Sequence, residues 1–406
     1  MIGVNPAGKR SAVGDHAHLP AVAGADRRDV MSDERAAWIA LASLPGVGPV
    51  GFASIIRQLG SAAMAVDTDP VRVLDLLPRA DAETLAALRN LSRVGAMGVA
   101  AQLVDNAQRA GGSVMTVLDD AYPPSLARLE HRPPVLYVLG AVSALSQPSV
   151  AVVGTRRPSG YGRAMAVEIA DELARAGVAI VSGLALGIDA AAHLAALDAG
   201  GVTVGVLPSP IDRIYPPRHR GLATRIVAEG GALVSEAPPG RLTGKPDFAR
   251  RNRIISGLAE AVVVVEAPDH SGALLTASSA VAQGRDLYAV PGPIDAITSR
   301  GCNRLIADHQ AELVTSAVSL VQRLGRRPVG RSATAVATLS ETEALVIGAL
   351  LNRSGSIEEL LGRLDLSTAT MASALTLLEA RGLVVSYGGV TFHPTLDAKR
   401  IGAPKP

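Results

Sequence analysis

The feature that most constrains the fold is a regular alternation of short apolar runs and helical patterns between residues 113 and 330. The runs are rich in Val, Ile and Ala, as expected for strands covered on both faces. They are Val135–Val138, Val150–Val153, Ala179–Ser182, Thr203–Leu207, Ala232–Ser235, Ala261–Glu266 and Asp286–Val290. Helical patterns separate them at Gly162–Ala176, Asp189–Ala199, Arg218–Glu229 and Gly272–Gln283. This order predicts βαβ units in an α/β fold with a mainly parallel, doubly wound sheet.

Composition limits the classes of function. Aromatic residues are 2% of the 406 residues, so the core must be aliphatic. Basic and acidic residues nearly cancel, at 39 against 37, so any basic surface has to be local. A single cysteine, Cys302, excludes a disulfide framework and a cysteine-based zinc site. We expect a cytoplasmic protein with no metal and no cofactor. No apolar run reaches the roughly 18 residues that cross a membrane, and residues 1–32 lack the apolar region of a secretory signal.

The chain divides into segments of different character. We expect a disordered tail (1–32), a helical domain (33–110), the α/β domain (111–321), a basic linker (322–338) carrying Arg323, Arg326, Arg327 and Arg331, a small domain (339–395) and a second tail (396–406). Helices of the first domain are predicted at Glu34–Leu44, Val50–Leu59, Ala82–Leu91 and Val99–Ala110. The turn between the first two, 44–49, resembles a helix-hairpin-helix, in which backbone amides bind a DNA phosphate. Pro-Gly turns between helices are also common.

The small C-terminal domain has the order of a winged helix. Its second helix is expected to start at Ser367 and Thr368, and strands Leu383–Ser386 and Val390–Phe392 flank a Gly388-Gly389 turn. The helix at Ala369–Ala380 contains no Arg or Lys. That composition favours contact with protein, or only weak contact with DNA.

The first loop of the α/β domain, 154–162, joins a strand to a helix start and contains Gly154, Thr155, Arg156 and Arg157. Amides at a helix start attract anions, and guanidinium groups match phosphate oxygens. A tight turn with two solvated arginines is an equally good interpretation of this loop alone. Its glycines do not follow G-x-G-x-x-G, and the chain has no P-loop motif, so dinucleotide binding and P-loop hydrolysis are not expected.

A second loop, 182–187, contains Ser182, Gly183 and Gly187 and leads to Asp189, an expected N-cap. Asp189 and His193 share one helix face, where a hydrogen bond is favoured over an acid–base pair.

Further loops add polar residues at the same predicted edge of the sheet. They contribute Tyr215, Arg218 and His219, then Arg251, Asn252 and Arg253, then Ser271, Gly272 and Thr276. In open α/β sheets, ligands bind outside the carboxyl ends of the strands. The convergence therefore predicts a ligand with several phosphates, which these residues alone do not divide between a nucleotide and an oligonucleotide.

Ordered motifs across residues 34–395 resemble the DNA-processing protein A family, also called Smf or DprA. The strongest stretches are VAVVGTRRPSGYG (150–162), SGLALGIDAAAH (182–193), IDRIYP (211–216), FARRNRIISGL (248–258), SGALLTASSAVAQGRDLYAVPG (271–292) and SRGCNRLI (299–306). The family often carries a lysine directly after Tyr-Pro, where this chain has Pro217, and a polar residue where it has Leu186.

The resemblance implies a non-enzymatic protein that binds and protects single-stranded DNA and helps load the RecA recombinase in natural transformation and homologous recombination. It implies a dimer of extended Rossmann-like domains, flanked by an N-terminal SAM or helix-hairpin-helix-like domain and a C-terminal winged helix. It assigns DNA contacts to Arg156, the glycine turns, Arg218 or His219, and the 251–253 triplet. A nucleotide-acting phosphoribohydrolase, using Glu266 or Asp189, and a protein-binding scaffold are the alternatives.

Overall fold

The computed structural model describes residues 27–79, 81–327, 339–381, 383–387, 391–395 and 398. Two compact units divide the chain, one ending at Gln102 and one beginning at Leu103. This division falls within helix α6 (Arg93–Arg109), some residues before the boundary expected from the sequence. Helix α1 begins at Arg27, inside the segment expected to be a tail. The rest of that tail, the linker from residue 328 on, the Gly388-Gly389 turn and most of the second tail lie outside the described residues.

The first unit consists of helices, as the periodicity predicted. They are α1 (Arg27–Ser43), α2 (Pro49–Leu59), α3 (Ala62–Asp67), α4 (Pro70–Leu74), α5 (Ala82–Arg89) and the start of α6. Trp38 and Phe52 pack with ring centroids 4.8 Å apart, which joins α1 to α2. The Glu34 carboxylate accepts hydrogen bonds from the Ala62 and Ala63 amides at the start of α3. The helix-hairpin-helix assignment of the turn between α1 and α2 stays a prediction.

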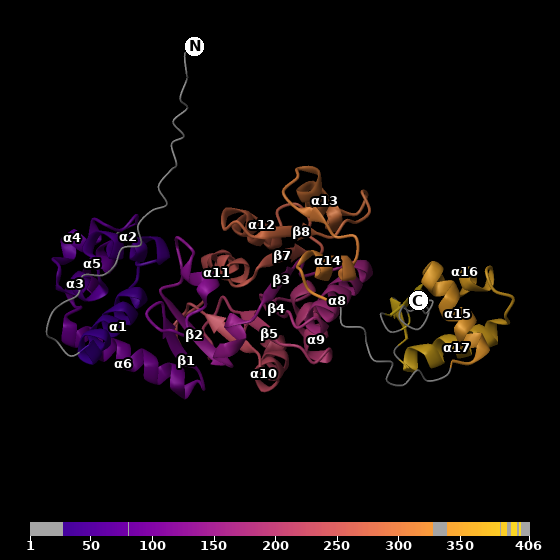
Figure 1. Cartoon of the computed structure of the whole chain (residues 1–406), viewed down its shortest axis with the longest axis horizontal. Helices are drawn as coiled ribbons and strands as arrows, with labels where there is room; N and C mark the ends of the chain where they lie inside the picture. The colour runs from indigo at the N-terminus through magenta and orange to yellow at the C-terminus, as the bar shows by residue number, and fades with distance from the viewer. Residues whose placement is uncertain are drawn as a thin grey trace, which may run out of the picture. The chain divides into compact units, whose positions relative to one another are not determined.

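A nine-stranded sheet organises the second unit (Figure 1). Its strands are β1 (Ser113–Thr116), β2 (Val135–Gly140), β3 (Ser149–Val153), β4 (Ala179–Ser182), β5 (Thr203–Val206), β6 (Ala232–Ser235), β7 (Ala261–Val264), β8 (Asp286–Ala289) and β9 (Glu312–Leu313). The spatial order is β1-β2-β6-β5-β4-β3-β7-β8-β9. All pairs from β6 to β9 are parallel, whereas β1–β2 and β2–β6 are antiparallel. The mainly parallel sheet predicted from the sequence is confirmed.

Helices cover both faces of this sheet (Figure 1). They are α7 (Pro124–Ala127), α8 (Gly160–Arg175), α9 (Ile188–Asp198), α10 (Arg220–Ala228), α11 (Lys245–Leu258), α12 (Gly272–Ala282), α13 (Arg300–Ala307) and α14 (Ala317–Arg323). Val150 and Val152 of β3 pack with α8, α9 and α14, whereas Ala151 and Val153 pack with α11 and α12. Successive residues of β3, and likewise of β7, thus enter opposite cores, which explains why these central strands are continuously apolar.

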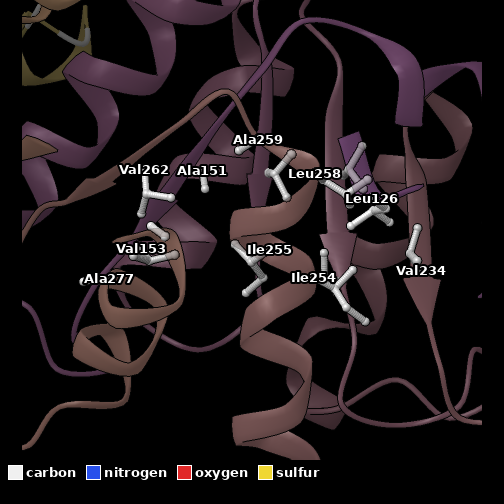
Figure 2. Close-up of a cluster of buried hydrophobic side chains, with 14 of the residues drawn as sticks. Leu126, Ala151, Val153, Val234, Ile254, Ile255, Leu258, Ala259, Val262 and Ala277 are labelled. Carbon is white, nitrogen blue, oxygen red and sulfur yellow. The ribbon is translucent and has the colours of Figure 1, made fainter. Parts of the chain in front are cut away.

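The core on the α11 side is built mainly from aliphatic side chains. Figure 2 shows Ile254, Ile255 and Leu258 of α11 directed at Val153, Val262 and Val234 of the strands, with Ala277 of α12 alongside. All of these side chains are buried. Ala151 and Ala259 are buried among these branched side chains. This packing fixes where α11 begins, at the carboxyl ends of the strands.

A separate apolar cluster organises the C-terminal segment. Its helices are α15 (Glu341–Asn352), α16 (Ile357–Leu361) and α17 (Thr368–Ala380), and its strands are β10 (Gly355–Ser356), β11 (Val384–Tyr387) and β12 (Thr391–Pro394) in the order β10-β12-β11. Ser367 caps α17 by accepting a hydrogen bond from the Thr370 amide, as predicted. The winged-helix assignment stays a prediction. Among the described helices of the chain, none is long and apolar enough to cross a membrane.

Candidate functional site

The strand order brings the predicted site residues to one edge of the sheet. Strand β3 lies between β4 and β7. The strands that follow β3 in sequence, β4 to β6, lie on one side of it, and β7 to β9 lie on the other side. Such a switch point is where open α/β sheets bind ligands. Gly154 to Arg157 follow β3, and the other loops follow β4, β5 and β7 at the same carboxyl edge. The triplet 251–253 lies in α11, which follows β6.

Arg156 and two aromatic rings form a contacting group at this edge, in which Arg156 and Tyr215 are exposed and Phe248 is half-buried. The Arg156 guanidinium carbon lies 5.6 Å from the centroid of the Phe248 ring. Tyr215 meets the same ring nearly edge-on, with centroids 5.4 Å apart and an interplanar angle of 80°. Arg156 and Arg157 are exposed, and neither pairs with a carboxylate among the described residues. A cation over a ring is held by the ring quadrupole, which leaves its N–H groups available to an anion.

The turn at 183–185 is held from beneath by three side chains. Arg251 donates to the carbonyl oxygens of Gly183, at 2.6 Å, and Val206. Asp189 accepts from the Gly183 and Ala185 amides at 3.1 and 3.3 Å. His219 Nδ1 lies 2.8 Å from the Leu184 carbonyl oxygen. Leu184 itself has φ 54°, a left-handed conformation uncommon for a side chain of this kind.

Asp189 corrects one sequence prediction. Helix α9 begins at Ile188, and the N-cap is Gly187 with φ 85°. Asp189 is therefore inside the first turn, and its carboxylate binds the preceding loop in place of capping the helix. Burial raises its pKa, opposed by the nearby Arg251 charge. A Cβ on Gly187 would lie 2.4 Å from the Thr155 carbonyl oxygen, so the 154–157 and 183–187 loops touch at this glycine.

Arg251 and Arg253 point into the protein. Arg251 is 7% exposed, and burial lowers its pKa to about 10, so it remains charged at neutral pH. Arg253 forms an ion pair with Glu236 and donates to the His131 carbonyl oxygen at 2.7 Å. Asn252, also buried, accepts from Arg251 Nε and donates to the Gly272 carbonyl oxygen, both at 3.2 Å. The triplet thus connects neighbouring loops, and its contact with phosphates stays a prediction.

Glu266 is the acid nearest the first loop. Its carboxylate accepts from the Ser159 amide at 2.9 Å, the Ser159 hydroxyl at 2.5 Å and the Thr298 hydroxyl at 3.2 Å. A Cβ on Gly162 would lie 2.1 Å from Glu266 Oε2, so α8 approaches this carboxylate through a glycine. Glu266 and Asp189, the two acids considered for catalysis, therefore both bind loops. These contacts give the enzyme alternative no support.

His193 lies away from the edge. Its Nδ1 is 2.7 Å from the Thr203 hydroxyl oxygen, which donates in turn to the Ile180 carbonyl oxygen. Nδ1 is therefore the donor to Thr203. Burial, with the charges of His219 and Arg251, lowers the pKa of His193 to about 3. The hydrogen bond expected between Asp189 and His193 is wrong, because both side chains have other partners.

The other predicted residues support the loops. Ser182 donates to the Val152 carbonyl oxygen at 2.6 Å, and Ser271 caps α12 by accepting from the Ala273 amide. Thr155 accepts from the Arg157 amide at 3.2 Å, Thr276 is buried in α12, and Arg218 is exposed. The sequence prediction did not include Phe248 among the site residues. Its position at the start of the arginine-rich motif, in a chain with few aromatic residues, was the signal that could have identified it.

The segment that contains this site is similar in sequence and in structure to known proteins. The profile of the family described as "DNA recombination-mediator protein A" matches residues 113–325. A Mycobacterium tuberculosis protein described as a DNA processing protein DprA is 36% identical over 379 residues, covering 87% of this chain and 92% of the relative. Protein Smf of Escherichia coli is 45% identical over 203 residues, covering 50% and 54%. The X-ray structure of DNA processing protein A from Streptococcus pneumoniae superposes with TM-score 0.59 at 31% identity, covering 71% and 97%.

Proposed function

This chain belongs to the DNA recombination-mediator protein A family, and from that premise we propose that it binds single-stranded DNA at the carboxyl edge of its central sheet. The observation that carries the proposal is the grouping of Arg156, Phe248 and Tyr215. A guanidinium suits a phosphate, and ring faces suit unpaired bases, which are the two parts of a single strand. A duplex hides its bases and offers mainly its phosphates.

The roles within the site follow from burial. Arg156 and Arg157 contact phosphates directly, with Arg218 exposed nearby in sequence to Tyr215. Arg251, Asn252, Asp189 and His219 act as positioning residues, because each hydrogen-bonds a neighbouring loop or side chain of the site. Since phosphate contacts dominate, affinity should be sensitive to salt and weakly selective for sequence.

The wider role is a proposal on family grounds. We infer that the chain protects single strands and helps load the RecA recombinase during natural transformation and homologous recombination, and that it acts as a homodimer in the cytoplasm. Helix α17 carries no Arg or Lys, which favours a protein contact over DNA binding for the C-terminal segment. No enzymatic step is proposed.

The test is fluorescence anisotropy of a labelled oligothymidine over a salt series. Arg156→Ala should lose about 1–3 kcal/mol of binding free energy and reduce the slope of log K against log salt by about 0.7. Arg225→Ala is the charge-matched control, because Arg225 lies in the last turn of α10, towards the amino edge of the sheet, and pairs with Asp198 and Glu229. It should bind like the parent.

Equal affinity of the parent and Arg156→Ala proteins would remove this site from the proposal. Tighter binding of duplex than of single-stranded DNA would contradict the assignment of single-stranded DNA as the ligand. Release of free base from a nucleoside monophosphate would support the enzyme alternative.

A further inference from the structure

Among the described side chains, the exposed aromatic rings lie at one edge of the sheet. The chain has one Trp, six Tyr and three Phe. Among the side chains that the structure describes, only Tyr215, at 43%, and Tyr161, at 42%, are aromatic and expose more than a third of their surface. Tyr215 follows β5, and Tyr161 lies in the first turn of α8, directly after the β3 loop. Both exposed rings thus belong to segments that follow strands at the carboxyl edge of the sheet.

Tyr215 follows a strand on one side of β3, and Tyr161 is hydrogen-bonded to the loop after a strand on the other side. The Tyr161 hydroxyl donates to the Pro291 carbonyl oxygen at 2.9 Å, which fixes the ring beside the loop that follows β8. In the sheet, β5 lies two places from β3 on one side and β8 two places on the other. With strands about 4.8 Å apart, each step of two strands spans roughly 10 Å. Tyr161 is five positions after Arg156, which limits their Cα separation to about 18 Å.

The loop beside Tyr161 presents an apolar tip. Ile294 is 91% exposed and Ile297 is 64% exposed. The base of this loop is fixed at two points. The Asn303 amide bonds both the N–H and the carbonyl of Gly292, at 3.1 and 2.9 Å, and Thr298 bonds Glu266. Because Glu266 also holds Ser159, the apolar tip and the Arg156 loop are positioned by one carboxylate.

Exposed arginines near Tyr161 and near the tip in sequence suit a polyanion. Arg157, Arg163 and Arg300 are exposed, and none has an ion-pair partner among the described residues. Asp295 is the single acid between the two isoleucines. A protein partner would bring its own acids to this surface; a nucleic acid strand brings phosphates at every step and a base for each apolar face.

We propose that Tyr161, with Ile294 and Ile297, is a second stacking subsite for a base of the same single strand, on the far side of Arg156 from Tyr215. This rests on the proposed function, since the strand must first occupy the Arg156 site. It extends the track from the β5 loop to the β8 loop, so a short oligonucleotide fills the Arg156 and Tyr215 end, and a longer one also reaches Tyr161.

The experiment compares oligothymidines of about four and about twelve nucleotides on the full chain. Tyr161→Ala should bind the shorter one like the parent and the longer one roughly 5- to 10-fold more weakly, the lower part of the range for loss of one stacked base. Tyr161→Phe keeps the ring and should recover most of the affinity, although it lacks the hydroxyl that bonds Pro291. The paired change of Ile294 and Ile297 to Ser should weaken only the longer oligonucleotide.

Leu194→Ala, an exposed apolar change on α9, is the control for a general loss of apolar surface. If Tyr161→Ala binds both lengths like the parent, the subsite is overturned. If only the variant with Ile294 and Ile297 changed to Ser binds the longer oligonucleotide like the parent, the two isoleucines are not part of the subsite, and a protein partner is the better occupant for them. If the parent itself binds neither length, the proposed function fails. An unchanged thermal midpoint excludes misfolding.

Discussion

The guanidinium carbon of Arg156 lies 5.6 Å from the centre of the Phe248 ring. The two residues are 92 positions apart in sequence, and they meet because β3 ends and α11 begins at the carboxyl edge. The same ring receives the edge of Tyr215. Phe248 therefore contacts both exposed groups of the proposed site, and it orients a cation that no carboxylate among the described residues holds.

Replacing Phe248 with Leu should weaken binding of oligothymidine by about 0.5–2 kcal/mol, because the cation–ring contact and the edge contact to Tyr215 are both lost. Stability should change little, since the ring is partly exposed. Anisotropy titration measures the affinity, and thermal unfolding checks the fold. Leu242→Ala, a change at a 75% exposed residue of the preceding loop, is the control. If Phe248→Leu bound oligothymidine with the affinity of the parent, the contact between Arg156 and the Phe248 ring would not contribute to binding.

Substitution by alanine should have opposite effects on stability at two glycines near helix starts, Gly162 and Gly272. At Gly162 the new Cβ would lie 2.1 Å from Glu266 Oε2, so Gly162→Ala should lower the free energy of unfolding by about 1–3 kcal/mol. At Gly272 nothing lies within 4 Å, so Gly272→Ala should raise it by about 0.4–1 kcal/mol through the unfolded chain. Urea denaturation measures both. A stable Gly162→Ala protein would mean that Glu266 moves freely.

His193 should make stability depend on pH. Burial first, then the charges of His219 and Arg251, lowers its pKa from 6.5 to about 3 in the folded protein. The unfolded chain therefore binds a proton more readily, and the free energy of unfolding falls as pH drops from about 6.5 towards 3. The loss at pH 5 is about 2 kcal/mol from this group.

His193→Asn keeps a donor for Thr203 and does not titrate, so it is the matched variant. Urea midpoints at pH 7 and 5 should differ less for His193→Asn than for the parent. An identical pH dependence in both proteins would mean that folding does not change the pKa of His193, contrary to its burial.

The sequence predicted the parallel strands of the sheet well, because a strand covered on both faces must be continuously apolar. It missed β1 and β9. Strand β1 is the short segment Ser113–Thr116, and β9 is only two exposed residues, Glu312 and Leu313, so neither has an apolar run. The same limit applies to α3 and α4, which are too short to show a periodicity.

The loops of the site were predicted, but the direction of each side chain was not. Arg156 and Arg251 both lie in arginine-rich motifs, so the sequence does not distinguish their environments. Arg156 is exposed over the Phe248 ring, whereas Arg251 is buried and bonds the Gly183 carbonyl oxygen. Burial is set by the packing of α11 on the sheet, which involves residues far apart in the chain. Asp189 shows the same limit, since Gly187 at φ 85° displaced it from the cap position.

The turn at 183–185, with its left-handed Leu184, is held by Arg251, Asp189 and His219 before any ligand arrives. The conformational entropy lost in fixing this segment belongs to folding and not to association. Its shape should therefore be the same in the free and the occupied protein. If a single strand binds along this edge as proposed, it would meet a rigid surface, and the DNA backbone would have to adapt to the protein.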